Sequence, residues 1–330
     1  MSMSGQALQF NISTKIALLR QAVQRTPEAP SWLFELSAAL AEAGEERESA
    51  AVFRQAFRLD PKSVRWLQGV AEETDPHATR NVRDRMRSLI AHRTIFSPVI
   101  AALAIAEAHL GNETEVRKLV DYDRFFRCHP IEPPEGFRDS GFHTLLAAEI
   151  KSDLRFYDEP ESRSIRKGWR NNGIIGSELP ASRALIGLLR NHVDQYITRL
   201  PVDSDHPFVA SRPAEYVLEG WAVVSDGASH HTSHIHPRAW LSGVYYVVRP
   251  PVSMEAGTDR GWLRVGPPAH SGILAGWDVR RVEPAPGNLV LMPGYFYHDT
   301  EPMATNEERI CVAFDVVPAE IAAASPAADY

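Results

Sequence analysis

Four of the thirteen histidines of this 330-residue chain fall in the segment His230–Pro237. Within it, His234 and His236 are separated by one residue, and His298 follows much later in the chain. On a β-strand, side chains two residues apart point to the same face. The spacing therefore predicts a strand from which His234 and His236 bind one metal ion, with His298 as the third ligand. Three imidazoles suit iron, copper, nickel or zinc, so the ligand type alone does not select the metal.

Arg309 lies eleven residues after His298 and begins a run of strand-forming residues. Alternation along that strand places Arg309, Cys311 and Ala313 on one face, which leaves a slot beside the guanidinium. Arginine is suited to bidentate binding of a carboxylate. We therefore expect a dicarboxylate that chelates the metal at one end and contacts Arg309 at the other. The structural alternative is an ion pair between Arg309 and a nearby acid: Glu307, Glu308 or Asp315.

The elements that must position these residues are short strands in the second half of the chain. Aromatic or β-branched runs are separated there by Gly, Pro and Asp turns, which is typical of a barrel or sandwich. Two helical segments precede them, Phe142–Ser152 and Ser182–Tyr196. The predicted strands are Tyr216–Val224, Ala239–Val248, Trp262–Val265, Asn288–Leu291 and Ile310–Val317.

Residues 14–120 differ in texture, because apolar residues recur there at three- and four-residue steps typical of helices. The segment Leu33–Pro61 resembles a tetratricopeptide repeat, with Gly44 in the turn between two helices. Pro27 and Pro61 are separated by one period of that repeat, and Gly44 and Gly111 by nearly two. A single helix pair cannot bury its apolar face, so stacked neighbours are expected to supply the core.

The bulk composition is that of an ordinary globular protein, with 44% hydrophobic and 23% charged residues. A net charge of −7 gives no sign of a nucleic-acid partner. No apolar run is long enough to span a bilayer, and the N-terminus lacks the features of a signal peptide. Two scattered cysteines form no disulfide framework. We therefore expect a cytoplasmic protein that binds neither nucleic acid nor membranes.

Three sequence motifs resemble those of the Fe(II)- and 2-oxoglutarate-dependent dioxygenases, in particular a branch that carries His-x-His-Pro, Leu-Ser-Gly-Val-Tyr-Tyr and a distal His and Arg. This chain has these motifs at His234–Pro237, Leu241–Tyr246, and His298 with Arg309. The resemblance covers roughly residues 122–318, and tetratricopeptide repeats ahead of such a domain are familiar in this branch.

The resemblance implies an α+β chain in three parts. Residues 1–121 would form tetratricopeptide-like helical repeats, 122–318 a double-stranded β-helix (jelly-roll) barrel with flanking helices, and 319–330 a flexible tail. Fe(II) would bind to His234, His236 and His298, with 2-oxoglutarate as co-substrate and O2 as oxidant. Arg309 would hold the distal carboxylate of 2-oxoglutarate. Ser242 and Tyr246 share a strand face and could donate hydrogen bonds to the same carboxylate, although Tyr246 could equally be a core residue.

His236 departs from the usual triad of this superfamily, which has a carboxylate at that position. The nearest acids, Asp226 and Asp299, are not at the expected spacing. His236 is therefore either a true third ligand or the site has two histidines, with water or substrate completing it. Three neutral imidazoles leave more positive charge on the metal than a triad with a carboxylate, which favours anionic ligands.

The expected function is hydroxylation of a peptide or protein that the helical repeats recruit. Two alternatives remain open. The first is a cupin-like metal enzyme that does not use 2-oxoglutarate, because Gly287, Pro293 and His298 nearly match a cupin motif. The second is a non-catalytic scaffold that the metal stabilises. The residues do not determine the oligomeric state.

Overall fold

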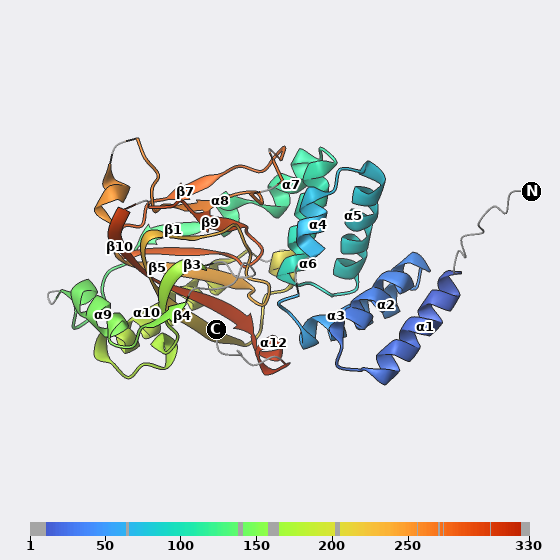
Figure 1. Cartoon of the computed structure of the whole chain (residues 1–330), viewed down its shortest axis with the longest axis horizontal. Coiled ribbons are helices and arrows are strands. Elements are labelled where there is room, and N and C mark those ends of the chain that lie inside the picture. Colours follow the sequence, from blue (N-terminus) through green and yellow to red (C-terminus); the bar gives the residue numbers. More distant parts are fainter. Residues whose placement is uncertain are drawn as a thin grey trace, which may run out of the picture.

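The computed structural model describes residues 11–63, 66–137, 141–157, 165–201, 205–255, 257–269, 271–272, 274–303 and 305–324. The N-terminal third is helical and the rest combines β-sheets with flanking helices (Figure 1). None of the helices in these ranges is long and apolar enough to cross a membrane.

In the described part of the region predicted to be helical there are seven helices, and that prediction is confirmed. Gly44 and Gly111 have φ angles of +79° and +73° in the turns after α2 and α6, which favour glycine. Whether the helices are tetratricopeptide repeats stays a prediction. The helices are α1 (Ile12–Arg25), α2 (Pro30–Glu42), α3 (Glu46–Leu59), α4 (Trp66–Glu72), α5 (Pro76–Ala91), α6 (Ser97–His109) and α7 (Glu113–Leu119).

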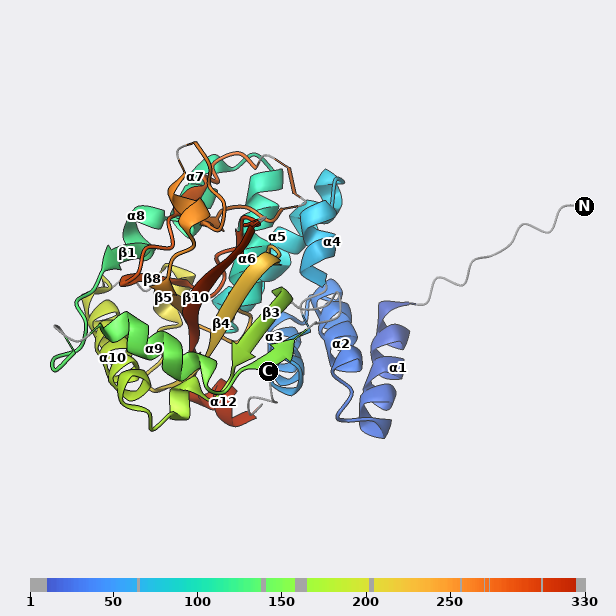
Figure 2. The ribbon, with the colours of Figure 1, turned by 60° about the vertical axis from the view of Figure 1, so that its left-hand side comes forward.

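Helix α6 is the innermost of these helices. Residues 97–108 are all buried, and five of its thirteen residues are alanines, which allow close packing on every side. The helix lies between α5 and the strands (Figures 1 and 2). One buried cluster accordingly continues from the helices into the sheets. The predicted domain boundary at residues 121–122 stays a prediction.

The β-region contains one seven-stranded and one three-stranded sheet, and every strand pair is antiparallel. The large sheet has the order β1-β8-β5-β10-β4-β3-β2 and the small sheet the order β7-β6-β9. The predicted α+β class with a jelly-roll core is confirmed. The strands are β1 (Arg127–Pro130), β2 (Arg155–Tyr157), β3 (Ile165–Asn171), β4 (Tyr216–His231), β5 (Leu241–Val248), β6 (Leu263–Val265), β7 (Arg280–Val282), β8 (Asn288–Pro293), β9 (His298–Thr300) and β10 (Thr305–Pro318).

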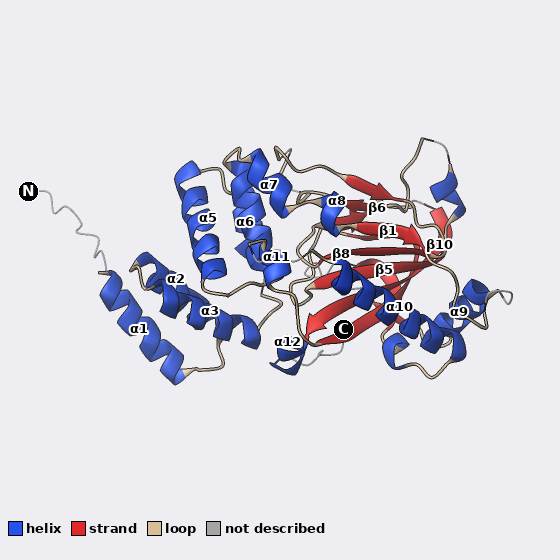
Figure 3. Cartoon of the chain, turned by 180° about the vertical axis from the view of Figure 1, so that it is seen from behind, coloured by secondary structure: helices blue, strands red, loops and turns tan. Residues whose placement is uncertain are grey.

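The flanking helices lie outside the large sheet. Helix α10 (Pro180–Arg199) lies in front of its strands in Figure 3, and α9 (Phe142–Lys151) lies beside the ends of the strands. The two helices match those expected there. Shorter helices complete the fold: α8 (Tyr122–Phe125), α11 (Pro207–Ala210) and α12 (Ala319–Ala324). Helix α12 occupies the start of the expected flexible tail, and its Ile321 is buried. Residues 325–330 lie outside the described residues.

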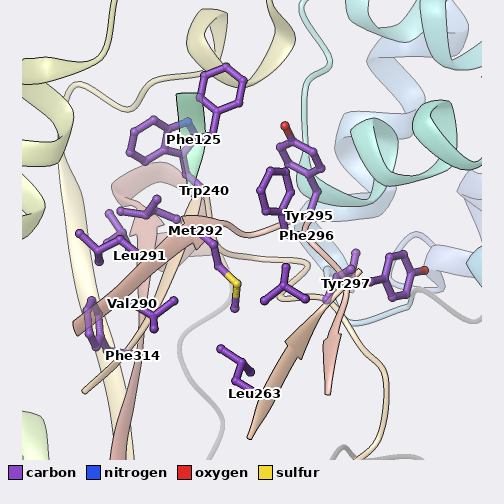
Figure 4. Close-up of a cluster of buried hydrophobic side chains, with 14 of the residues drawn as sticks. Phe125, Trp240, Leu263, Val290, Leu291, Met292, Tyr295, Phe296, Tyr297 and Phe314 are labelled. Atoms are coloured by element: carbon purple, nitrogen blue, oxygen red, sulfur yellow. The ribbon is translucent and has the colours of Figure 1, made fainter. Parts of the chain in front are cut away.

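The connection between β8 and β9 passes through the core. Its residues Tyr295, Phe296 and Tyr297 are buried (Figure 4). The Tyr295 hydroxyl donates a hydrogen bond to the Leu119 carbonyl of α7 (2.6 Å). A Cβ on Gly294 would lie 2.1 Å from the Ala239 carbonyl oxygen, so only glycine allows this close approach of the two segments. The helical region therefore contacts the segment that leads into His298.

Candidate metal centre

His234 and His236 converge with the distant His298 between the two sheets. One ligand nitrogen from each of His234, His236 and His298 lies within 4.8 Å of the others. The Nε2 atoms of His236 and His298 are 3.2 Å apart. Histidine nitrogens bind transition metals at about 2.0–2.1 Å, so adjacent ligands of one ion lie about 3 Å apart. The imidazoles therefore fit a shared metal ion.

The segment that carries His234 and His236 is not the strand that we predicted. It lies in the connection between β4 and β5, where His234 forms an isolated antiparallel bridge with His298. The His236 N–H donates to the Gly294 carbonyl at 2.9 Å. Backbone bonds to the β8–β9 connection thus replace strand alternation in bringing the rings together. The His298 side chain is buried at the start of β9.

The second ring nitrogen of each histidine faces an acceptor. His234 Nδ1 lies 2.6 Å from the Thr232 carbonyl, and His298 Nδ1 lies 3.0 Å from the Phe296 carbonyl. A carbonyl only accepts, so both Nδ1 atoms carry the proton and both Nε2 atoms keep a free lone pair. His236 Nδ1 lies 2.6 Å from Asp315 Oδ1. Metal-binding histidines have this arrangement, in which the outer nitrogen contacts a carbonyl or carboxylate.

Burial keeps the His234 and His298 rings neutral at neutral pH. The pKa of His234 is lowered to about 3, mainly by loss of hydration and to a smaller extent by the nearby His236. The pKa of His298 is held well below its usual value, mainly by loss of hydration and to a smaller extent by the nearby His234. Because a neutral imidazole is the form that binds a metal, both residues are ready to coordinate at neutral pH.

Arg309 is 2% exposed and lies in β10 on the wall of the same cavity. It donates hydrogen bonds to the Gly261 carbonyl (2.8 Å) and to Ser225 Oγ (3.4 Å), and its Nε has no partner within the described structure. No carboxylate of the described residues pairs with it. The three acids considered as partners are engaged elsewhere: Glu307 with the Val252 N–H, Glu308 with Lys151, and Asp315 with His236.

The cavity between the sheets joins the histidines to Arg309. Cys311 and Ala313 line it beside Arg309, as alternation predicted, and Ser242 and Tyr246 line it from β5. Ser242 Oγ also donates a long hydrogen bond to the Phe314 carbonyl (3.4 Å). All six predicted site residues therefore border one cavity, whereas their roles stay predictions.

Sequence reasoning missed three contributors to this site. Asp315 lies behind His236, and its place on the same strand face as Arg309 was the available signal. Trp221 lines the cavity and stacks on His236, with 6.1 Å between the ring centroids. His231 ends β4 and lines the cavity.

Residues 219–315 match the family model described as "Putative 2OG-Fe(II) oxygenase". This match includes the three histidines and Arg309, and it confirms the resemblance predicted from the motifs. The family uses Fe(II), 2-oxoglutarate and O2, and the histidine cluster fits the iron. The comparison thus shows that this segment is similar to the 2-oxoglutarate- and Fe(II)-dependent oxygenases. No curated protein matches the chain.

Several solved structures are similar to parts of the chain. A prolyl-4-hydroxylase from Pseudomonas putida is 16% identical with a TM-score of 0.41, covering 60% of this chain and 95% of its own. A prolyl hydroxylase from Trichoplax adhaerens, in complex with a hypoxia inducible factor peptide fragment, is 17% identical with a TM-score of 0.41, covering 66% and 94%. A 2OG-Fe(II) oxygenase family oxidoreductase from Burkholderia pseudomallei is 14% identical with a TM-score of 0.40, covering 67% and 92%.

Proposed function

We propose that this protein is an Fe(II)- and 2-oxoglutarate-dependent hydroxylase with His234, His236 and His298 as the iron ligands. The observation that carries the proposal is the orientation of the rings. In His234 and His298, Nδ1 contacts a backbone carbonyl, and in His236 it contacts Asp315. The Nε2 atom of each ring therefore remains available to bind a metal. In His236 and His298 these nitrogens face each other at 3.2 Å, a separation that a shared cation stabilises.

Arg309 supports 2-oxoglutarate as the co-substrate. A buried guanidinium is costly unless an anion compensates it, and its described partners are a neutral carbonyl and a hydroxyl. The distal carboxylate of 2-oxoglutarate supplies the missing charge in a bidentate geometry. The Ser242 and Tyr246 hydroxyls lie on the same cavity wall and are proposed to donate to that carboxylate.

Bound Fe(II) and 2-oxoglutarate supply the oxidising chemistry that inserts an oxygen atom of O2 into a C–H bond. The chain contributes ligands, charge and a dry environment. Leu263 and Met292 line the cavity as apolar side chains, which keep water away from the reacting centre. Arg309 fixes the direction in which the diacid enters.

The proposal is tested by titrating the purified protein with Fe(II) and 2-oxoglutarate under nitrogen, then adding O2 and measuring succinate. We expect both ligands to bind and succinate to form slowly without substrate. The variant His298→Ala should bind neither iron nor 2-oxoglutarate tightly. Metal binding without 2-oxoglutarate binding would favour the cupin-like alternative. Binding of both without succinate would favour the scaffold.

We further propose that the substrate is a peptide or protein that the helical region recruits. Stacked helix pairs form extended surfaces that bind polypeptides, and Leu18 and Trp32 are 51% and 43% exposed on α1 and α2. The double variant Leu18→Ala/Trp32→Ala should raise the KM for a substrate peptide while uncoupled succinate formation is unchanged. Mass spectrometry of candidate peptides should show the addition of one oxygen atom. Equal KM values for the two proteins would contradict recruitment by this surface.

A further inference from the structure

The Asp315 carboxylate is buried directly behind His236. Its Oδ1 lies 2.6 Å from His236 Nδ1, and the two side chains are 6% and 10% exposed. Asp315 lies on β10 and shares a strand face with Arg309. One strand therefore places a cation on the cavity wall and an anion behind the metal-binding His236.

Asp315 has no other charge partner within the described structure. The nearby cation Arg238 is held by Glu219, with nitrogen–oxygen distances of 2.8 and 3.1 Å. Asp315 Oδ1 lies 2.6 Å from His236 Nδ1 and has no other partner among the described residues. An isolated buried carboxylate is unfavourable unless a cation compensates it. A divalent ion on the far side of His236 provides that compensation.

The lack of charge on the three imidazoles also indicates that the metal site needs a nearby anion. Neutral histidines leave the full charge of a divalent ion in a buried cavity whose lining contains one further cation, Arg309, and no carboxylate among the described residues. A carboxylate behind a metal-bound imidazole makes the ligand more basic and spreads negative charge toward the ion. His234 and His298 contact neutral carbonyls instead, so this effect is confined to His236.

We propose that Asp315 is a positioning residue that acts through His236: it orients the ring for metal binding and supplies the negative charge that the three neutral ligands lack. The inference rests on the proposed metal site. It explains how His236 can serve as a ligand in a buried site without a carboxylate on the metal. The alternative is that the contact between Asp315 and His236 only stabilises the fold.

The variant Asp315→Asn separates these alternatives, because it keeps the shape of the side chain and removes its charge. The matched control is Glu149→Gln, which neutralises another buried carboxylate. Glu149 accepts bonds from Ala181 N–H, Ser182 N–H and Ser182 Oγ at the start of α10, away from the cavity. Both variants are expected to lower stability. Only Asp315→Asn is expected to change the metal site.

The measurements are the Kd for Co(II), from its visible absorption, and the Fe(III)/Fe(II) potential. We expect Asp315→Asn to weaken Co(II) binding by about 10- to 100-fold. It should also raise the Fe(III)/Fe(II) potential, because the loss of negative charge near the iron destabilises Fe(III) relative to Fe(II). Glu149→Gln should match the wild type in both. Unchanged Kd and potential in Asp315→Asn would overturn the inference. Failure of the wild type to bind Co(II) or Fe(II) would instead overturn the proposed function.

A second measurement needs no variant, in case Asp315→Asn does not fold. In the Zn(II)-loaded wild-type protein, the imidazole N–H protons are followed by nitrogen-resolved NMR. The His236 proton should resonate further downfield than those of His234 and His298, because its neighbour is charged and theirs are neutral carbonyls. Three equivalent shifts would contradict the proposed role of Asp315.

Discussion

His234 and His298 exchange two backbone hydrogen bonds, each 3.0 Å long, although they are far apart in the sequence. This isolated bridge joins the β4–β5 connection to β9 and places the two imidazole centroids 4.3 Å apart. The two ligands therefore depend on each other's backbone, whereas His236 is held separately by Gly294. A change that opens the bridge should disturb both ligands together.

Replacement of Arg309 should separate binding of the diacid from binding of the metal. Arg309→Met keeps most of the apolar volume and removes the charge. We expect 2-oxoglutarate binding to weaken by about 10- to 100-fold, the range for a lost charged hydrogen-bonding pair, while the Co(II) Kd changes little. Arg309→Lys should recover part of the affinity, since it restores the charge without the planar fork. Calorimetric titration measures both ligands; an unaltered 2-oxoglutarate Kd in Arg309→Met would rule out this role.

Gly294 should tolerate no side chain, because an added Cβ would meet the Ala239 carbonyl oxygen at 2.1 Å. We expect Gly294→Ala to lower the free energy of unfolding by about 1–3 kcal/mol or more and to weaken metal binding through His236. Gly187→Ala is the control: it lies in α10 with nothing within 4 Å of the added Cβ. It should stabilise the protein by about 0.5–1 kcal/mol. Urea unfolding of both variants tests the contrast.

The contact between α6 and the histidine segment should affect the metal site from a distance. Ser97 Oγ donates a buried 2.6 Å hydrogen bond to the Ala239 carbonyl, three residues after His236. We expect Ser97→Ala to cost about 1 kcal/mol of stability and to weaken Co(II) binding several-fold. Ser49→Ala removes a buried hydroxyl between α2 and α3 and should lower stability only. Equal Co(II) affinities in the two variants would show that the Ser97 contact does not reach the site.

Replacement of His231 should change the binding of 2-oxoglutarate or substrate in the cavity but not the binding of the metal. It lines the cavity, and its ring makes no hydrogen bond to the described residues, although its N–H donates to Thr300 Oγ1 (2.8 Å). We expect His231→Ala to change the KM for 2-oxoglutarate or substrate severalfold while the Co(II) Kd stays within about twofold. A large loss of Co(II) affinity would instead make His231 a metal ligand.

Acid should destabilise the metal-free protein. The pKa of His234 is about 3 in the folded chain, and that of His298 is also lowered; unfolded histidine titrates near 6.5. Between pH 6.5 and 3 the unfolded state therefore binds more protons than the folded state. The contribution of these histidines to the free energy of unfolding is fully present above pH 6.5 and is lost as the pH decreases. The slope is at most about 1.4 kcal/mol per pH unit for each histidine. Urea unfolding in chelator should show a shallower dependence for His298→Gln.

The sequence was informative where periodicity is strong. Apolar spacing predicted α9 and α10 within a few residues of their observed ends, and alternation placed Cys311 and Ala313 beside Arg309 on the cavity wall. These features depend on neighbours along the chain. The convergence of His298 with His234 was also predicted, but only from their chemistry.

Long-range backbone contacts explain what the sequence did not reveal. The prediction of a strand through His234 and His236 was wrong, because bonds from His298 and Gly294 orient the rings without regular pairing. Asp315 was considered only as a partner for Arg309, since local spacing does not show that it meets a ring from a much earlier part of the chain. Short strands such as β1 and β9 were also not predicted. β1 is exposed throughout, so it has no apolar alternation.

The cavity wall can form only when strand β10 is in its correct register. Cys311, Ala313 and Arg309 face the ligand side, whereas the bulky Ile310, Val312 and Phe314 fill the opposite layer. Slippage by a single residue would exchange the two sets, replacing the guanidinium and the carboxylate with hydrocarbon. Heating should therefore reduce the number of competent molecules and leave the turnover of each remaining folded molecule unchanged.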